Sequence, residues 1–330
     1  MKGVRPVQVV EAVLADIGPY LQAVEQQLRT AMDDSGAETR DIALHLIESG
    51  GKRIRPIMTL LSARVFARDV QRAVPLGVAA ELIHMATLVH DDVIDEANTR
   101  RGRPTVNSRW GNHSAVLAGD CLLAKALVIL VDHSTPEIVR IMSDMILRMC
   151  DGEIQQKASL GRLDQTEEDY YRRIEKKTAL FFAACCQSGA LLHGATPDQA
   201  RALAEYGRNI GMAFQVVDDL LDVSGEAAVV GKPVGSDLAA GVLTLPVIYL
   251  LQQDGMRERV EAILGGGTAI DAQQVQAVLE LVRSNGAIEY SRQVAAAFAQ
   301  RAQKELEALP AGEGRELLAL IADELLQRAY

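Results

Sequence analysis

The sequence predicts an all-α protein, and three observations lead to that prediction. Hydrophobic residues make up 48% of the 330 residues, aromatic residues only 4%, and there are just 10 prolines. Alanine and leucine supply the apolar content in place of the β-branched and aromatic residues that favour strands. Apolar residues also recur with a helical period along almost the whole chain, and no pair of strand-like segments stands out. We therefore expect one large helical bundle with short loops.

Gly, Pro, Asn and Asp residues interrupt the helical period and place the expected helix ends. Two helices carry a start signal: Thr166 with Asp169 resembles a capping box, and Pro197 follows Thr196 at a first helical position. The helices between these breaks are joined by short loops, so we expect residues 1–330 to form a single domain. In chain order, the breaks lie at residues 33–36, 50–51, 98–104, 161–164, 196–197, 224–236, 265–267 and 310–314.

The charge balance and the apolar runs exclude several classes of protein. The formal net charge of −10 argues against binding to nucleic acid through phosphate neutralisation and gives no attraction to anionic lipid. No run reaches the roughly 18 uninterrupted apolar residues typical of a membrane span, and the N-terminus lacks the apolar core of a signal peptide. We therefore expect a cytoplasmic protein. Four cysteines without CxxC spacing are expected as small core residues: Cys121, Cys150, Cys185 and Cys186.

Two aspartate clusters share the spacing DDxxD and directly continue apolar helical runs, LIHMATLVHDDVIDE and FQVVDDLLDV. The first and last aspartates of each cluster lie on the same helix face and repel each other. A solvent-exposed acidic helix end is the alternative, but charge at a core boundary is costly unless it is compensated. Mg²⁺ would compensate it, because Mg²⁺ takes one or two carboxylates with water and phosphate oxygens. The acids are Asp91, Asp92, Asp95, Asp218, Asp219 and Asp222.

Basic residues occur where a phosphate ligand would need them. The stretch GGKRIRP places cations directly after a glycine turn that opens a helix, and TRRGRPT follows the first aspartate cluster. Arginine forks match phosphate oxygens in a bidentate manner. A solvated basic face is the alternative for each run taken alone, but their alternation with aspartates indicates two phosphorylated ligands. The cations are Lys52, Arg53, Arg55, Arg100, Arg101, Arg103, Lys176, Lys177 and Lys232.

These motifs, in this order from GGKRIRP to GSDLAAGVLTLPVIYLL, resemble those of the trans-prenyl diphosphate synthases, or polyprenyl synthetases. The resemblance covers residues 45–252. It implies an all-α bundle around a deep central cavity, usually in a dimer. It also implies a reaction that adds isopentenyl diphosphate to an allylic diphosphate, such as farnesyl or geranylgeranyl diphosphate, and releases diphosphate.

The resemblance also assigns roles to residues that match the family's motifs. The expected ligands of isopentenyl diphosphate are Lys52, Arg55, His84 and Arg101. The expected contacts to the allylic diphosphate are Arg100, Lys177, Thr178, Gln215 and Lys232, and the last four are the candidate catalytic residues. The expected Mg²⁺ ligands are Asp91, Asp95, Asp218 and Asp222, with Asp92 and Asp219 in support. His84 alone would more often be a core histidine, but it lies two helical turns before Asp91 on the same face.

One residue departs from the family pattern. Where the family commonly has lysine in GKxTLP, this chain has Val242, which removes one phosphate contact. The segments LIHMATLVHDDVIDE, YRRIEKKTAL and GKPVGSDL are most similar to the catalytic component, component 2, of heptaprenyl diphosphate synthases. That resemblance implies either a homodimer or a heteromer with a small non-catalytic component, and a product used for the menaquinone side chain. A lipophilic product would also bring peripheral contact with a membrane.

Product length is expected to depend on small residues just before the first aspartate cluster. Ala86 and Thr87 leave room where short-chain enzymes often carry aromatic residues. We therefore expect a long product, with heptaprenyl diphosphate first and octaprenyl or geranylgeranyl diphosphate as alternatives. A terpene cyclase would share the first cluster but not GGKRIRP and DDLLD. A non-catalytic regulatory subunit is the other alternative, and Val242 is the feature that favours it.

Overall fold

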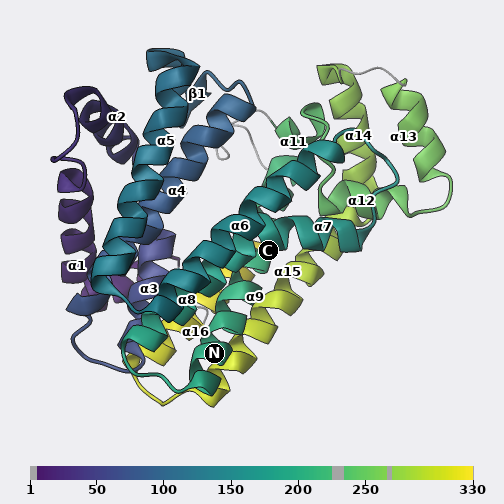
Figure 1. The fold of residues 1–330 in the computed structure, drawn as a ribbon. Coiled ribbons are helices and arrows are strands. Elements are labelled where there is room, and N and C mark those ends of the chain that lie inside the picture. The colour runs from purple at the N-terminus through teal and green to yellow at the C-terminus, as the bar shows by residue number, and fades with distance from the viewer. Residues whose placement is uncertain (1–5, 225–233, 266–269, 330) are drawn as a thin grey trace. The chain divides into compact units, whose positions relative to one another are not determined.

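The computed structural model describes residues 6–224, 234–265 and 270–329, and it is all-α as predicted (Figure 1). The chain divides into two compact units. Unit 1 comprises Met1–Ser143, Ala184–Ala204 and Leu306–Ala319, and unit 2 comprises Asp144–Ala183, Glu205–Glu305 and Leu320–Tyr330. We describe each unit by itself, and the single domain over residues 1–330 stays a prediction.

Unit 1 is built around one apolar helix. Helix α4 (Val74–Ile94) is buried along most of its length because its sequence is apolar on every side. Helix α5 (Val106–His133) runs beside α4, and α1 (Pro6–Thr30) and α3 (Ile54–Arg64) pack against it as well (Figure 1). The remaining elements that begin in this unit are α2 (Ala37–Glu48), η1 (Gln71–Ala73), β1 (Thr99–Arg100), β2 (Arg103–Pro104), α6 (Pro136–Ala158), α9 (Pro197–Ser224), η3 (Leu306–Ala308) and α16 (Glu313–Ala329).

Helix α5 exposes more apolar surface than a core helix needs. By length and composition, two segments could cross a membrane, Gln71–Ile94 and Val106–His133. In the most apolar 18-residue stretch of each, 72% of the first is buried but only 33% of the second. The first segment is apolar because it packs in the core. The second leaves a set of large apolar side chains in solvent: Val116, Leu117, Val128 and Val131.

The cysteine prediction is half correct. Cys185 and Cys186 on α8 (Leu180–Leu192) are buried, and burial raises the pKa of the Cys185 thiol to about 12. Cys121 on α5 and Cys150 on α6 are exposed, so the prediction that they lie in the core is wrong. The apolar context misled that prediction, because α5 and α6 also carry apolar residues on their exposed faces.

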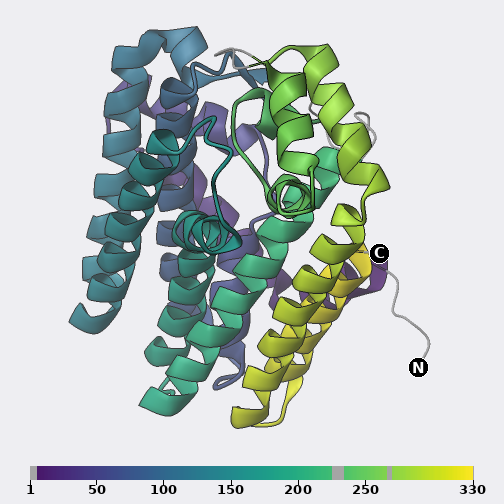
Figure 2. The same ribbon diagram turned by 90° about the vertical axis from the view of Figure 1, so that its right-hand side faces the viewer.

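Unit 2 has its core around the short helix α12 (Leu245–Leu251), in which six of the seven residues are buried. Helix α15 (Ala287–Glu305) packs along it, and Figure 2 shows this side of the chain. Helices α13 (Met256–Leu264), α14 (Ala272–Ser284) and α7 (Glu167–Ile174) also contact α12. The C-terminal segments therefore complete the core of this unit. The remaining elements are the π-helical turn η2 (Glu175–Ala179) and α11 (Ser236–Ala239).

Both predicted helix starts are confirmed. Thr166 and Asp169 form a reciprocal capping box at the start of α7, in which the Asp169 amide donates to Thr166 Oγ1 at 3.2 Å. The Gln199 amide donates to Thr196 Oγ1 at 3.3 Å, where α9 begins at Pro197. A further prediction was wrong: β1 and β2 form a two-stranded antiparallel hairpin, although no strand pair was expected.

Candidate functional site

Two neighbouring cations in the glycine turn before α3, Lys52 and Arg53, differ in their exposure to solvent. Lys52 is exposed, whereas Arg53 adopts a left-handed φ of 49° and turns inward at the start of α3. The Arg53 guanidinium forms ion pairs with Glu25 and with Glu81, the latter at 2.9 Å from Nη1 to Oε1. Arg53 therefore fixes the turn that carries Lys52, a role that the sequence alone did not indicate.

His84 on α4 lies among the arginines that were predicted to bind diphosphate. Its pKa is held well below the ordinary value, first by burial and then by the positive charges of Arg55, Arg101 and Arg100, with a smaller effect of Arg53. The imidazole is therefore neutral near pH 7. Four predicted site residues, Arg55, His84, Arg100 and Arg101, are thus brought together within unit 1.

The hairpin after α4 positions two of these arginines. Gly102 has a φ of 74° and Arg101 one of 52°, which closes the turn between the two short strands. Arg101 donates through Nη1 to the carbonyl oxygen of Gly50, which links this hairpin to the glycine turn. Arg100 Nε donates to Asp92 Oδ1 at 2.9 Å. Burial raises the pKa of Asp92, and the Arg100 charge opposes that rise.

The outer aspartates of the first cluster lie where a cation could reach them. Asp91 is half-buried in the last turn of α4, and Asp95 is exposed at its C-cap. Within the described ranges, no three His, Cys, Asp or Glu side chains converge into a closed metal cage. Two carboxylates on one helix face, open to solvent, fit a Mg²⁺ ion whose other ligands are water and phosphate oxygens.

A chain of hydrogen bonds joins three predicted residues in unit 2. Thr178 Oγ1 donates to Gln215 Oε1 at 2.9 Å, and Gln215 Nε2 donates to Asp219 Oδ1 at 2.9 Å. Tyr170 completes the chain, because its hydroxyl donates to Asp219 Oδ2 at 2.7 Å. Burial and the charge of Asp237 raise the pKa of Asp219 to about 7, although these hydrogen bonds oppose the rise. The sequence did not single out Tyr170; its spacing of two helical turns before Lys177 was the available signal.

The other predicted residues of unit 2 differ in accessibility. Asp218 is exposed on α9. Asp222 is buried, and it accepts hydrogen bonds from Ser236 Oγ at 2.8 Å and from the Asp237 amide at 3.2 Å. In this geometry Asp222 holds the start of α11, so Asp218 is the more accessible of the two predicted Mg²⁺ ligands. Lys232 lies outside the described residues.

The turn η2 carries Lys177 and Thr178 and is tied to two neighbouring helices. Lys177 Nζ pairs with Glu153 Oε1 of α6 at 2.8 Å, and Lys176 Nζ pairs with Asp151 Oδ2 at 2.5 Å. The first residue of the turn, Glu175, accepts a hydrogen bond from Arg208 Nε of α9 at 2.6 Å. A single π-helical turn inside an α-helical segment is common at functional sites.

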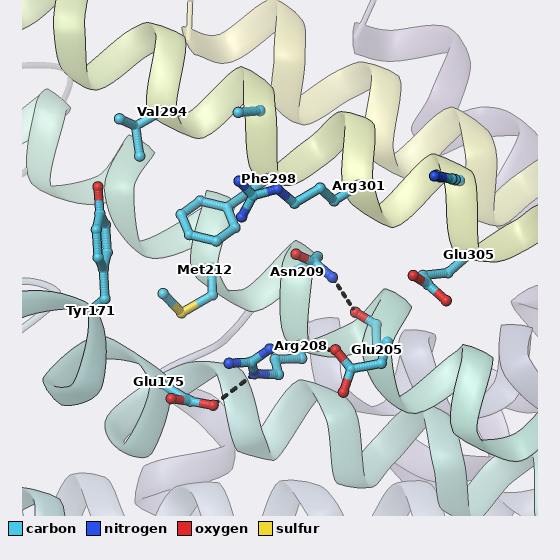
Figure 3. Close-up of a pocket in the computed structure, with 12 residues that line it drawn as sticks. Tyr171, Glu175, Glu205, Arg208, Asn209, Met212, Val294, Phe298, Arg301 and Glu305 are labelled. Atoms are coloured by element: carbon cyan, nitrogen blue, oxygen red, sulfur yellow. Dashed lines mark hydrogen bonds and ion pairs between the residues drawn. The ribbon is translucent and has the colours of Figure 1, made fainter. Parts of the chain in front are cut away.

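A cavity of about 610 Å³ lies next to this turn, and none of the predicted site residues within the described ranges lines it. Figure 3 shows the Glu175–Arg208 pair along one side and the aromatic ring of Phe298, from α15, on the other. The Arg301 guanidinium lies 5.3 Å from the centre of that ring. Glu175 therefore both lines the cavity and belongs to the turn that carries Lys177.

The fold and these groups define an all-α protein with residue types suited to diphosphates and divalent cations. A family model for polyprenyl synthetases matches residues 37–282. Heptaprenyl diphosphate synthase component 2 from Geobacillus stearothermophilus is 40% identical over 97% of this chain and 99% of its own length. A short chain isoprenyl diphosphate synthase from Methanothermobacter thermautotrophicus is 39% identical over 94% of this chain and 97% of its own length.

A solved polyprenyl synthase from Caulobacter crescentus, in complex with calcium and isoprenyl diphosphate, has a TM-score of 0.90 and 32% identity. The match covers 97% of this chain and 98% of that structure. The chain therefore belongs to the polyprenyl synthetase family. It is a prenyltransferase of isoprenoid biosynthesis.

Proposed function

We propose that the chain is a long-chain trans-polyprenyl diphosphate synthase. In the proposed reaction, isopentenyl diphosphate adds to farnesyl or geranylgeranyl diphosphate and diphosphate is released. The observation that supports it most is the group of Arg55, Arg100 and Arg101 around the neutral His84, because this group offers bidentate donors to a diphosphate. We assign isopentenyl diphosphate to Lys52, Arg55, His84 and Arg101.

The allylic diphosphate is assigned to Arg100, Lys177, Thr178, Gln215 and Lys232. Ionisation of its C–O bond leaves negative charge on the departing diphosphate, and fixed cations stabilise that charge without reorganisation. Mg²⁺ held by Asp91 and Asp95 would neutralise part of the same charge, and a further Mg²⁺ held by Asp218, with Asp222 as an additional candidate, would add to that effect. The double bond of isopentenyl diphosphate forms the new C–C bond, and the proton that is lost goes to the released diphosphate, as the family resemblance implies.

Heptaprenyl diphosphate is the product that we propose, and menaquinone the compound that it serves. The relative from Geobacillus stearothermophilus supports the heptaprenyl product, whereas the short chain relative has almost the same identity. Ala86, buried on α4 five positions before Asp91, favours the longer product, because it lacks the aromatic ring that is expected to block elongation in short-chain enzymes.

We further propose that the enzyme is cytoplasmic and works in an assembly. The apolar surface of α5 supports a partner there, because large exposed apolar patches on soluble proteins usually mark an interface. A second copy of the chain is the first candidate for that partner. The name "component 2" of one relative favours a heteromer with a small subunit, and Val242 fits a chain that depends on such help.

Incubation of the purified chain with farnesyl diphosphate, radiolabelled isopentenyl diphosphate and Mg²⁺ tests the proposal, with EDTA as control. We expect Mg²⁺-dependent products of C30 to C40, separated by chain-length chromatography. A product that stops at C15 or C20 contradicts the long-chain assignment. Absence of transfer, both alone and with a co-expressed small component, contradicts the synthase itself and favours a regulatory subunit.

A further inference from the structure

We propose that Glu153 is a positioning residue for Lys177: its carboxylate orients the ammonium group of Lys177 for the allylic diphosphate. The inference rests on the proposed role of Lys177 as a ligand of that diphosphate. Lys177 Nζ lies 2.8 Å from Glu153 Oε1, and the two side chains are 37% and 24% exposed. The pair is thus close to solvent but partly shielded, which suits a contact that must stay accessible to a ligand.

The surroundings of the pair show that α6 and the turn η2 fit each other closely. Gly152 precedes Glu153, and a Cβ atom at Gly152 would lie 2.8 Å from Lys176 Cβ. Only glycine therefore lets η2 approach α6 this closely. The acids on either side of Gly152, Asp151 and Glu153, pair with the two successive lysines of η2.

Of these two lysines, Lys177 is the one that we propose binds the allylic diphosphate. Lys176 is held by Asp151 and also donates to Gln155 Oε1 at 2.9 Å. Lys177 precedes Thr178, whose hydroxyl is fixed by Gln215. The turn therefore presents an ammonium and a hydroxyl side by side, each oriented by a group from a neighbouring helix.

Orientation of Lys177 has a direct consequence for binding. An ammonium group has three N–H donors, so it can contact a carboxylate oxygen and a phosphate oxygen at the same time. A lysine side chain that is already restricted loses less rotamer freedom when the ligand binds. Glu153 should therefore favour binding of the allylic diphosphate, even though its own charge is negative.

The test compares Glu153→Gln with the matched control Asp151→Asn. Each substitution removes one carboxylate charge from a lysine pair of the same turn. We expect Glu153→Gln to raise KM for farnesyl diphosphate about three- to fivefold, the size expected for a partly exposed ion pair, with KM for isopentenyl diphosphate unchanged. Asp151→Asn should leave both values unchanged, and Glu153→Asp should restore part of the affinity.

The Lys177→Gln variant separates the two hypotheses. If Lys177→Gln leaves KM for farnesyl diphosphate unchanged, the assignment of Lys177 as a ligand is wrong. If Lys177→Gln raises KM but Glu153→Gln leaves it unchanged or lowers it, the positioning role of Glu153 is wrong. In the double variant, Glu153→Gln should add nothing to Lys177→Gln, and a further increase would also contradict the inference. Circular dichroism and thermal unfolding of each variant identify any loss of fold.

Discussion

Replacement of Gly211 by alanine should displace the turn that carries Lys177 and Thr178. Gly211 lies on α9, and a Cβ atom there would be 2.5 Å from the backbone Cα of Ala179, the last residue of η2. Carbon atoms in contact normally lie about 3.5–4.0 Å apart, so the overlap is about 1 Å. A backbone atom cannot rotate away, and the turn or the helix must move.

The magnitude follows from two opposing effects. Overpacking of a core costs about 1–3 kcal/mol, and overlap with backbone belongs in the upper half of that range. Alanine regains about 1 kcal/mol relative to glycine in a helix interior. We therefore expect Gly211→Ala to lower the free energy of unfolding by about 1–2 kcal/mol. The control is Gly18→Ala on α1, where a Cβ atom meets nothing within 4 Å beyond its neighbours in the chain. Pro19 follows and disfavours helical backbone at a residue with a Cβ, which offsets the gain of alanine, so we expect little change in stability.

Urea unfolding of both variants measures this difference, and initial rates measure its effect on the turn. Movement of η2 should weaken the 2.9 Å hydrogen bond between Thr178 and Gln215 and raise KM for the allylic substrate. If Gly211→Ala unfolds at the same urea concentration as the wild type and keeps its KM, the close contact with Ala179 does not position η2. Equal shifts in both glycine variants would likewise refute the reasoning.

Three further predictions test other parts of the structure. The pKa of Asp219 is about 7 in the folded protein against about 3.8 in the unfolded chain, so the folded state holds an extra proton between these values. The free energy of unfolding should therefore fall as pH rises from about 4 to 7. Asp219→Asn should remove up to about 4 kcal/mol of this dependence in unfolding measured across that range. Arg53→Met should lower the free energy of unfolding, measured in urea, by about 3 kcal/mol, because Glu81 is left buried without its ion pair. The double variant Arg53→Met, Glu81→Met should recover part of that loss, because it leaves no buried charge of the pair unpaired. Ala86→Phe should shorten the product in chain-length chromatography, because a phenyl ring five positions before Asp91 is expected to block elongation. An unchanged product distribution would show that this position does not control product length.

The helix ends could be predicted where local chemistry determines them. The capping residues Thr166 and Thr196 act through hydrogen bonds to amides three residues away, so their signal is contained in a few residues. The break between α3 and α4, residues 65–73, has neither Gly nor Pro and was not predicted. The π-helical form of η2 was also beyond the sequence, because it depends on close packing against Gly152 and Gly211 of other helices.

The sequence could nominate candidate residues, but it could not show how their roles divide. Lys52 and Arg53 are adjacent and both positively charged, yet Lys52 is exposed and Arg53 is enclosed by Glu25 and Glu81. Both acids come from other helices, α1 and α4, so no local pattern announces them. A charged residue within a motif is therefore a candidate ligand only until its partners from distant segments are known.

The same division explains why each aspartate cluster begins with two adjacent acids. Neighbouring residues of a helix point about 100° apart, so they cannot both face the same cation at a core boundary. In the first cluster, Asp92 points inward and holds Arg100, while Asp91 and Asp95 share the outer face.

The second cluster repeats that arrangement for its first two acids. Asp219 is buried between Tyr170 and Gln215, while Asp218 is exposed. The periodicity would also place Asp222 on the face of Asp218, but Asp222 is covered because it holds the amide of Asp237 at the start of α11. Loss of the inner acid should therefore disorganise the cations and hydroxyls around the motif. Loss of an outer acid should instead weaken the response of the enzyme to Mg²⁺ while its fold persists.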